Sequence, residues 1–284
     1  SHADSISYIA AEKRYMNGNY ADAIRGMRDY LNKYCPGGRY CTTARYYLSD
    51  SYYQTNEKED ALASFKELLR LGVNQYTEEA IMRCAELTFD NKDYKLSLAY
   101  FQQLQTAAST SANKDVARLG ILRCSYFAND YETTIKIVNE IMHDSQASEQ
   151  VKSEARYNRA KAYLAQGQQE KALEDLKAIA EDTRTTSGAE AKYLIAEIYF
   201  KQDKLAAAED EIVDFTKKNT PHQYWLARSL VLLADVNVKL GDDFQAKQYL
   251  LSLQRNYTAN DEILELINER LSAINDRETQ KLAQ

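Results

Sequence analysis

The sequence predicts an all-α fold, a right-handed superhelical solenoid of about seven helix-turn-helix repeats. Three observations predict it. A small residue recurs every 36 to 38 positions, bulky apolar residues follow it at fixed offsets, and turn-forming residues fall at the same period. Periods of this length are typical of arrays in which supersecondary units stack along one direction. Such an array is held together by interfaces between neighbouring repeats instead of one central core.

The recurring small residue, here called the anchor, defines each repeat. The anchors are Ala23, Ala61, Ser97, Thr134, Ala172, Ala208 and Ala246. A second, mostly small column lies twelve residues earlier, at Ala11, Ser49, Ala85, Leu122, Ala160, Ala196 and Ala234. Large apolar residues stand four and seven positions after every anchor, which places them on one face of a helix. The small pair lets two antiparallel helices approach closely, and the bulky pair fills the groove beside them.

Turns separate the expected helices in order along the chain. Short turns inside the repeats lie at 17–19, 55–57, 91–93, 128–130, 166–168, 202–204 and 241–243. Loops between the repeats lie at 35–41, 72–77, 107–114, 143–150, 181–188 and 217–223. Gly, Asn and Asp in these segments tolerate the backbone angles that end helices, and both prolines, Pro36 and Pro221, fall between repeats. The expected order of elements in each repeat is therefore helix, turn, helix and loop.

A further amphipathic helix is expected after the seventh repeat, over residues 260–274. Its apolar stripe consists of Ile263, Leu264, Ile267, Leu271 and Ile274. The stripe suits either a cap over the last repeat or a helix for dimerisation or docking, and we favour the cap because repeat arrays need terminal caps. The expected organisation is one array at 4–257, followed by a capping helix and tail at 258–284.

Three segments resemble the tetratricopeptide repeat: GNYADAI at 18–24, RYYLSDSYY at 45–53 and YNRAKAYLAQGQQEKA at 157–172. The resemblance covers residues 5–257, although the family's usual period is about 34 residues. The proline that commonly closes each repeat is clear only at Pro36 and Pro221. Lengthened, proline-poor repeats are similar to those of bacterial cell-envelope members, such as outer-membrane-assembly lipoproteins. The resemblance implies a protein that binds other proteins.

Composition argues against several classes of partner. The chain has 36 Lys and Arg against 42 Asp and Glu, a net charge of −6, and no basic run. Nucleic acid is therefore not expected, because phosphate contacts need concentrated positive charge. No apolar stretch approaches the roughly 18 residues of a transmembrane helix. The chain begins at Ser1 without an initiator Met, so we expect a processed chain or a fragment whose signal peptide or lipid-attachment Cys would lie upstream.

No catalytic constellation is recognisable. The three histidines, His2, His143 and His222, lie far apart, and no His–Cys spacing resembles a zinc site. No glycine-rich phosphate loop is present, and the pairs of carboxylate residues are explained as solvated faces of helices. We therefore expect no metal, no cofactor and no enzymatic activity.

The four cysteines fall into two pairs. Cys84 and Cys124 lie inside expected helices among apolar neighbours, where a thiol usually acts as a small buried hydrophobe. Cys35 and Cys41 bracket the loop that contains Pro36. They would form a disulfide in an oxidising compartment and stay free in the cytosol, and the sequence leaves both states open. This pair and the family resemblance favour the cell envelope or periplasm, with the cytoplasm as the alternative.

The candidate binding surface is the first-helix face at fifteen, eleven and eight residues before each anchor, since these offsets share one side of a helix. The family resemblance implies that first helices line the concave side. The candidate residues are Tyr8, Glu12, Tyr15, Tyr46, Asp50, Tyr53, Glu86, Phe89, Tyr157, Tyr193, Glu197 and Phe200. Arg123 and Lys161 make the face basic in the fourth and fifth repeats. Packing between helices is the alternative explanation for the aromatic residues.

The function expected from these features is a non-catalytic scaffold that binds a peptide or protein segment, with basic residues, in its concave groove. Two alternatives stay open: a structural segment of a larger repeat protein or cell-envelope assembly complex, and the regulatory part of a longer enzyme. The partner, the biological process and the oligomeric state are not encoded in any recognisable motif.

Overall fold

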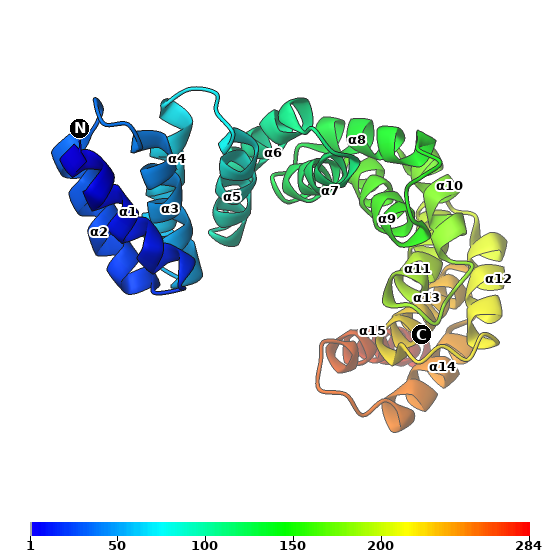
Figure 1. The fold of residues 1–284 in the computed structure, drawn as a ribbon. Coiled ribbons are helices and arrows are strands. Elements are labelled where there is room, and N and C mark those ends of the chain that lie inside the picture. The colour runs from blue at the N-terminus through cyan, green and yellow to red at the C-terminus, as the bar shows by residue number, and fades with distance from the viewer. Residues whose placement is uncertain (1) are drawn as a thin grey trace. The chain divides into compact units, whose positions relative to one another are not determined.

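The computed structural model describes residues 2–284, and its fifteen regular elements are all α-helices (Figure 1). Contacts divide the chain into two compact halves, residues 1–143 and 144–284. The N-terminal half contains α1 (His2–Met16), α2 (Tyr20–Tyr34), α3 (Cys41–Gln54), α4 (Lys58–Arg70), α5 (Thr77–Asp90), α6 (Tyr94–Ala107), α7 (Ser111–Phe127) and α8 (Tyr131–His143). The C-terminal half contains α9 (Glu149–Ala165), α10 (Gln169–Ile179), α11 (Thr186–Lys201), α12 (Leu205–Thr216), α13 (Gln223–Lys239), α14 (Asp243–Asn256) and α15 (Ile263–Ala283).

The first fourteen helices form seven helix-turn-helix pairs, and within each half successive helices pack against one another. The fold class expected from the sequence is therefore confirmed: the part of the chain that the structure describes, residues 2–284, is all-α and contains no strand. None of its helices combines the length and the apolar character that crossing a bilayer requires. The division at 4–257 and 258–284 stays a prediction.

The repeated small and bulky columns form the helix interfaces. All seven anchors are fully buried, and the small column twelve residues earlier is buried in every repeat. The bulky residues four and seven positions after the anchors are buried as well, except Ile179, which is partly exposed. In the third repeat the Ser97 hydroxyl donates to the Ala85 carbonyl at 2.7 Å, so a small polar anchor is satisfied across the helix pair. The anchor register read from the sequence is thus the register of the packing.

The turn inside every repeat uses one residue with a positive φ, five positions before the anchor. These residues are Gly18, Asn56, Lys92, Asn129, Gly167, Asp203 and Gly241, with φ between 59° and 81°. Gly, Asn and Asp reach this left-handed region at low cost, whereas Lys92 has no such advantage. The tight turn that reverses the chain is therefore the same in all seven pairs.

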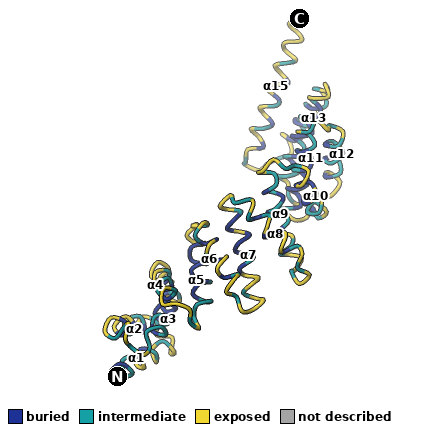
Figure 2. Tube along the Cα trace, turned by 90° about the horizontal axis from the view of Figure 1, so that it is seen from above, coloured by how far each residue is buried: buried dark blue, intermediate teal, exposed yellow. Residues whose placement is uncertain are grey.

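Helix α15 covers the last repeat. Ile263, Ile267, Leu271 and Ile274 are buried against α13 and α14. Their spacing of four, four and three residues follows one side of a helix. Leu264, which the sequence analysis placed on the same stripe, is 47% exposed, because it lies about 100° around the helix from Ile263. Figure 2 shows the buried positions of α15 alternating with exposed ones.

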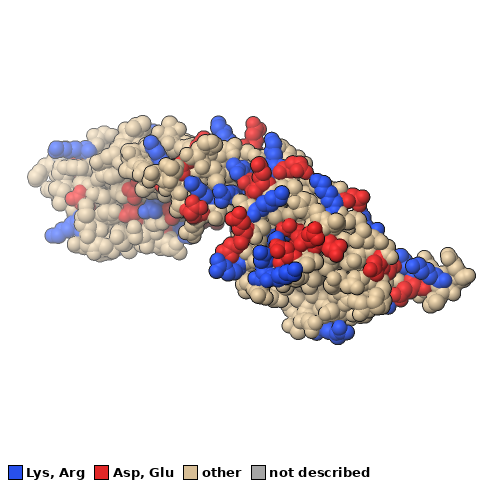
Figure 3. Space-filling model, turned by 90° about the vertical axis from the view of Figure 1, so that its right-hand side faces the viewer, with Lys and Arg blue, Asp and Glu red and all other residues tan. Residues whose placement is uncertain are grey.

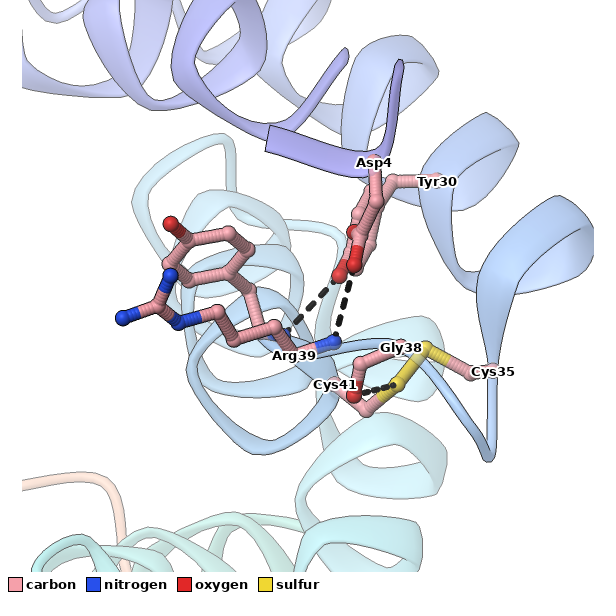
Figure 4. The surroundings of a disulfide bond; sticks show 7 residues. Asp4, Tyr30, Cys35, Gly38, Arg39 and Cys41 are labelled. Atoms are coloured by element: carbon pink, nitrogen blue, oxygen red, sulfur yellow. Dashed lines mark hydrogen bonds between the residues drawn. A yellow bond between two sulfur atoms is a disulfide. The ribbon is translucent and has the colours of Figure 1, made fainter. Parts of the chain in front are cut away.

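A disulfide closes the loop between α2 and α3. Cys35 and Cys41 are bonded, with their Cα atoms 5.7 Å apart (Figure 4). Around this loop the Asp4 carboxylate accepts the Arg39 backbone N–H at 3.0 Å, and the Tyr30 hydroxyl accepts the Tyr40 N–H at 2.9 Å. The loop is therefore tied to both α1 and α2. Cys84 and Cys124 are free and buried, as expected.

Candidate functional site

The first-helix face carries an open groove in each half of the chain. The N-terminal groove lies between α5 and α7 and has a volume of about 420 Å³. Its lining consists of Met82, Arg83, Glu86, Phe89, Asp90, Phe101, Val116, Leu119, Gly120 and Arg123. The groove forms because α5 and α7 are first helices of adjacent repeats, while α6 lies behind them and contributes the Phe101 ring.

The floor of the N-terminal groove is apolar, and Gly120 gives it depth. Met82 and Phe89 come from one side of α5, two turns apart, and Leu119 comes from α7. A Cβ atom on Gly120 would lie 2.3 Å from the Phe101 ring. The ring therefore packs directly on the α7 backbone, and any side chain at position 120 would displace it.

The rim of this groove holds Arg83 between an aromatic neighbour, Tyr53, and an acidic neighbour, Glu86. The Arg83 guanidinium lies 4.1 Å from the centre of the Tyr53 ring and donates to Glu86 Oε2 at 3.0 Å. Tyr53 in turn donates its hydroxyl hydrogen to Glu86 Oε1 at 3.0 Å. Burial and this hydrogen bond both raise the pKa of Tyr53, so its hydroxyl remains a donor at neutral pH. The network fixes Glu86 in place at the groove edge.

Acidic and basic groups alternate around the same rim. Asp90 is exposed and its Oδ2 lies 3.7 Å from the Lys58 ammonium, while Arg123 is exposed on the α7 side. On the molecular face drawn in Figure 3, Lys and Arg side chains are interspersed with Asp and Glu in the same way. The groove thus offers an apolar floor between charges of both signs.

The C-terminal groove is smaller, about 180 Å³, and lies between α11, α13 and α15. Tyr193 donates to Glu197 Oε2 at 2.5 Å, and burial is the main cause that raises the pKa of Tyr193 to about 12. Arg270 of α15 binds both carboxylate oxygens of Asp235, at 2.8 and 3.1 Å. This pair and the ion pair between Lys201 and Glu197, at 3.3 Å, engage four of the five charged side chains that line the groove.

The structure separates the twelve predicted site residues into those that line a groove and those that do not. Glu86 and Phe89 line the N-terminal groove, and Tyr193, Glu197 and Phe200 line the C-terminal groove. Seven others line neither of these two grooves: Tyr8, Glu12, Tyr15, Tyr46, Asp50, Tyr53 and Tyr157. Whether any of the twelve binds a partner stays a prediction.

Most of those seven engage one another in tyrosine–carboxylate pairs. Tyr8 donates to Glu12 at 2.5 Å and Tyr15 donates to Asp50 Oδ2 at 2.5 Å. Tyr157 donates to Glu190 Oε1 at 2.7 Å. Tyr53 donates to Glu86, as described above, and Tyr46 stacks on Tyr76 with ring centres 4.1 Å apart. Much of the predicted aromatic and acidic face is therefore occupied by packing between neighbouring helices.

Three of the predicted contact residues are buried in the folded chain. Tyr8, Asp50 and Tyr193 are all buried, with less than a tenth of their surface accessible. Tyr8 lies under the stacked ring of Tyr40, 4.2 Å away between centres. Neighbouring side chains therefore cover most of the surface of these three residues. The sequence pattern could not distinguish this, because the same columns supply both the interface and the surface.

Sequence analysis missed several groove residues, among them Arg83, Phe101, Val116 and Gly120. One signal was available. Gly120 stands in the interior of a helix, where glycine costs about 1 kcal/mol relative to alanine and often marks a close approach. Arg83 and Phe101 gave no comparable signal, because their role depends on the neighbouring repeat.

Comparison with known families decides the identity of the repeats. One model of the tetratricopeptide repeat matches residues 10–74 and 157–222, and a second matches residues 224–258. Together these matches cover more than half of the sequence. The chain belongs to the tetratricopeptide repeat family. Residues 75–156, which build the N-terminal groove, lie outside both matches, although their helices keep the same turn geometry.

Solved structures share this fold at low sequence identity. The C-terminal part of a TPR repeat-containing protein from Cytophaga hutchinsonii is 13% identical, covers 91% of this chain and 98% of its own, and has a TM-score of 0.59. Naa15/Naa10 bound to HypK-THB is 14% identical over 99% of this chain and 42% of that one, with a TM-score of 0.57. A tetratricopeptide repeat protein from Parabacteroides merdae is 15% identical over 96% and 99%, with a TM-score of 0.46. The comparison with curated proteins gave no match.

Proposed function

We propose that this tetratricopeptide repeat protein is a non-catalytic scaffold and that its N-terminal groove holds a segment of a partner protein. Repeats of this family generally mediate protein–protein interactions. The observation that supports this groove most strongly is its form: about 420 Å³ of open space with an apolar floor and a charged rim. Concave, mostly apolar sites with a few fixed polar groups are the usual form of binding sites.

The lining indicates the chemistry of the segment. A large apolar side chain would fill the floor between Phe89, Leu119 and the Phe101 ring. Flanking Lys or Arg residues would pair with Glu86 and Asp90, of which Asp90 is the more exposed. Pairing at an exposed rim is screened by salt and contributes more to association rate than to affinity. The proposed ligand is therefore an extended or helical segment with one apolar anchor and adjacent basic residues.

Selection from a library of displayed peptides, with the folded chain immobilised, tests the proposal. Selected peptides should lose about fivefold or more in affinity for Phe89→Ala, because truncation of a central aromatic contact usually costs more than about 1 kcal/mol. Phe244→Ala, a change at a strongly exposed phenylalanine outside the groove, is the matched control. Asp90→Asn should chiefly weaken the salt dependence of binding. Peptides that bind Phe89→Ala as well as the wild type would refute the assignment.

We further propose that the protein functions in an oxidising compartment, the cell envelope or periplasm. The support is the Cys35–Cys41 disulfide, since such bonds persist mainly outside the reducing cytosol. Alkylation of thiols during rapid lysis of the native cells, in a denaturant that exposes the buried Cys84 and Cys124, provides the test. Protection of two of the four cysteines is expected, and four alkylated cysteines would place the chain in a reducing compartment.

A further inference from the structure

The two walls of the N-terminal groove stand apart from one another. The backbones of α5 and α7 hardly approach each other, whereas those of the corresponding first helices α11 and α13 lie close together. On α5 the lining extends from Met82 to Asp90. On α7 it extends from Val116 to Arg123. Segments of this length span about 11 Å of helix, so the groove follows two turns of each wall.

The groove offers few groups that could hydrogen-bond an extended peptide backbone. Among the described residues that line it there is no Asn, Gln, Ser, Thr or Tyr, and its polar side chains are Arg83, Glu86, Asp90 and Arg123. The Arg83 guanidinium already donates to Glu86 at 3.0 Å. The backbone N–H and C=O groups of α5 and α7 are used within those helices. An extended segment would therefore leave its own backbone groups without partners above the apolar floor, which is unfavourable.

We propose that the segment held in the N-terminal groove is an amphipathic α-helix, an inference that rests on the function proposed for this groove. A helix pairs its backbone groups internally, so it requires only side-chain contacts from the walls. Helices that dock in apolar grooves place their anchors on one face, at three-, four- and seven-residue steps.

The apolar lining matches those steps. Met82 and Phe89 are seven residues apart on one side of α5, and both are partly exposed. Leu119 stands on α7 at the position equivalent to Met82, fifteen residues before its anchor. A ligand helix that lies along α5 would place one apolar side chain over Phe89 and the Phe101 ring. A second apolar side chain, two turns away, would lie between Met82 and Leu119.

The acidic rim indicates how such a helix would be rotated about its axis. Glu86 and Asp90 are four residues apart, so their carboxylates lie on the same side of α5, one turn from each other. Basic residues four apart on the facing flank of the ligand helix would lie next to both carboxylates. The expected ligand is therefore a helix with an apolar stripe and a basic flank.

Peptides of about 18 residues, or five helical turns, test the inference after selection from a displayed library on the immobilised 284-residue chain. Only peptides that lose affinity for Phe89→Ala are analysed further, because these occupy the groove. We expect them to carry apolar residues at three-, four- and seven-residue steps. Cα chemical shifts of the isotope-labelled peptide in the complex should show a helix of at least two turns.

Proline substitution in the peptide gives a second readout. Proline at a central position that faces away from the groove should weaken binding about a hundredfold, because it breaks the helix without removing a contact. Alanine at the same position is the matched control and should leave the affinity unchanged.

The possible outcomes separate this inference from the proposed function. Peptides that depend on Phe89 but tolerate the central proline, or whose bound Cα shifts are those of an extended chain, would overturn the helix and leave the groove assignment intact. Peptides that bind Phe89→Ala as well as the wild type would refute the function proposed for the groove, and the helix with it.

Discussion

The grooves in the two halves of the chain are built from the same first-helix columns, yet they present different surfaces. In the N-terminal groove Gly120 lets the Phe101 ring lie against α7, and the space stays open and apolar. In the C-terminal groove Leu232 occupies the position equivalent to Gly120, and α15 adds Arg270, which is bound to Asp235. The second groove is accordingly less than half the volume of the first.

This difference shows that separate positions in each repeat determine how its helices pack and what its surface presents. The anchors and the bulky columns are buried alike in both halves, so the helix pairs have a common packing. Groove size and charge are set by the residues between those columns. The predictions below test where the two halves should respond alike and where they should differ.

The largest effect is expected at the anchors, where the halves should behave alike. Ala61→Leu and Ala208→Leu each insert methylene groups at a fully buried helix contact. Overpacking of this kind typically costs about 1–3 kcal/mol of the free energy of unfolding. Ala63→Leu and Ala206→Leu, at exposed positions on the same two helices, serve as controls. Urea unfolding curves that leave either anchor variant unchanged would show that its half does not share the common packing.

The disulfide should distinguish the halves. Replacement of both cysteines, Cys35→Ser/Cys41→Ser, is expected to cost about 2 kcal/mol, because a short closed loop restricts the unfolded chain by that order. Hydrogen exchange should show the loss in α1, α2 and α3 and leave α11 to α14 unchanged. Reduced wild-type protein should match the double variant. A uniform loss over both halves would instead indicate that they unfold as one cooperative unit.

The turns allow a comparison of two substitutions, one in each half, that should change stability in opposite directions. Lys92 in the N-terminal half has φ of 61°, and Gly167 in the C-terminal half has φ of 73° at the equivalent position. Left-handed backbone costs a residue with a side chain about 1 kcal/mol. Lys92→Gly should therefore raise the melting temperature, and Gly167→Ala should lower it by a similar amount. Thermal unfolding followed by circular dichroism measures both, and shifts of the same sign would contradict the shared turn.

The smallest effect is expected from acid at the α15 end. Hydrogen bonds from Arg277 and Tyr224 lower the pKa values of Asp243 and Glu262 respectively. Because these pKa values are lower in the folded chain, the stabilisation is complete above the unfolded values, about 4, and is lost as the pH falls through the folded values. Fluorescence of Trp225, which contacts Tyr224, should report this change below about pH 4. Glu262→Gln should weaken that pH response, and an unaltered response would exclude Glu262 as its source.

The candidate site was predictable from the sequence only in part. Five of the predicted residues, Glu86, Phe89, Tyr193, Glu197 and Phe200, line grooves, and their role in binding stays a prediction. The sequence could not indicate that Asp50 would be buried beneath a hydrogen bond from Tyr15, thirty-five residues earlier. Such pairs join equivalent helices of adjacent repeats, and their geometry depends on how closely those helices approach.

By itself the sequence determined the helix pairs, their register, the position of each turn and the presence of a terminal amphipathic helix. These features are local, because small residues at fixed spacing and residues that tolerate a positive φ act within one repeat. Only the tertiary structure decided which polar groups pair and where the grooves open. Those outcomes depend on contacts between side chains about 35 residues apart in the sequence, which periodicity indicates as neighbours but cannot orient.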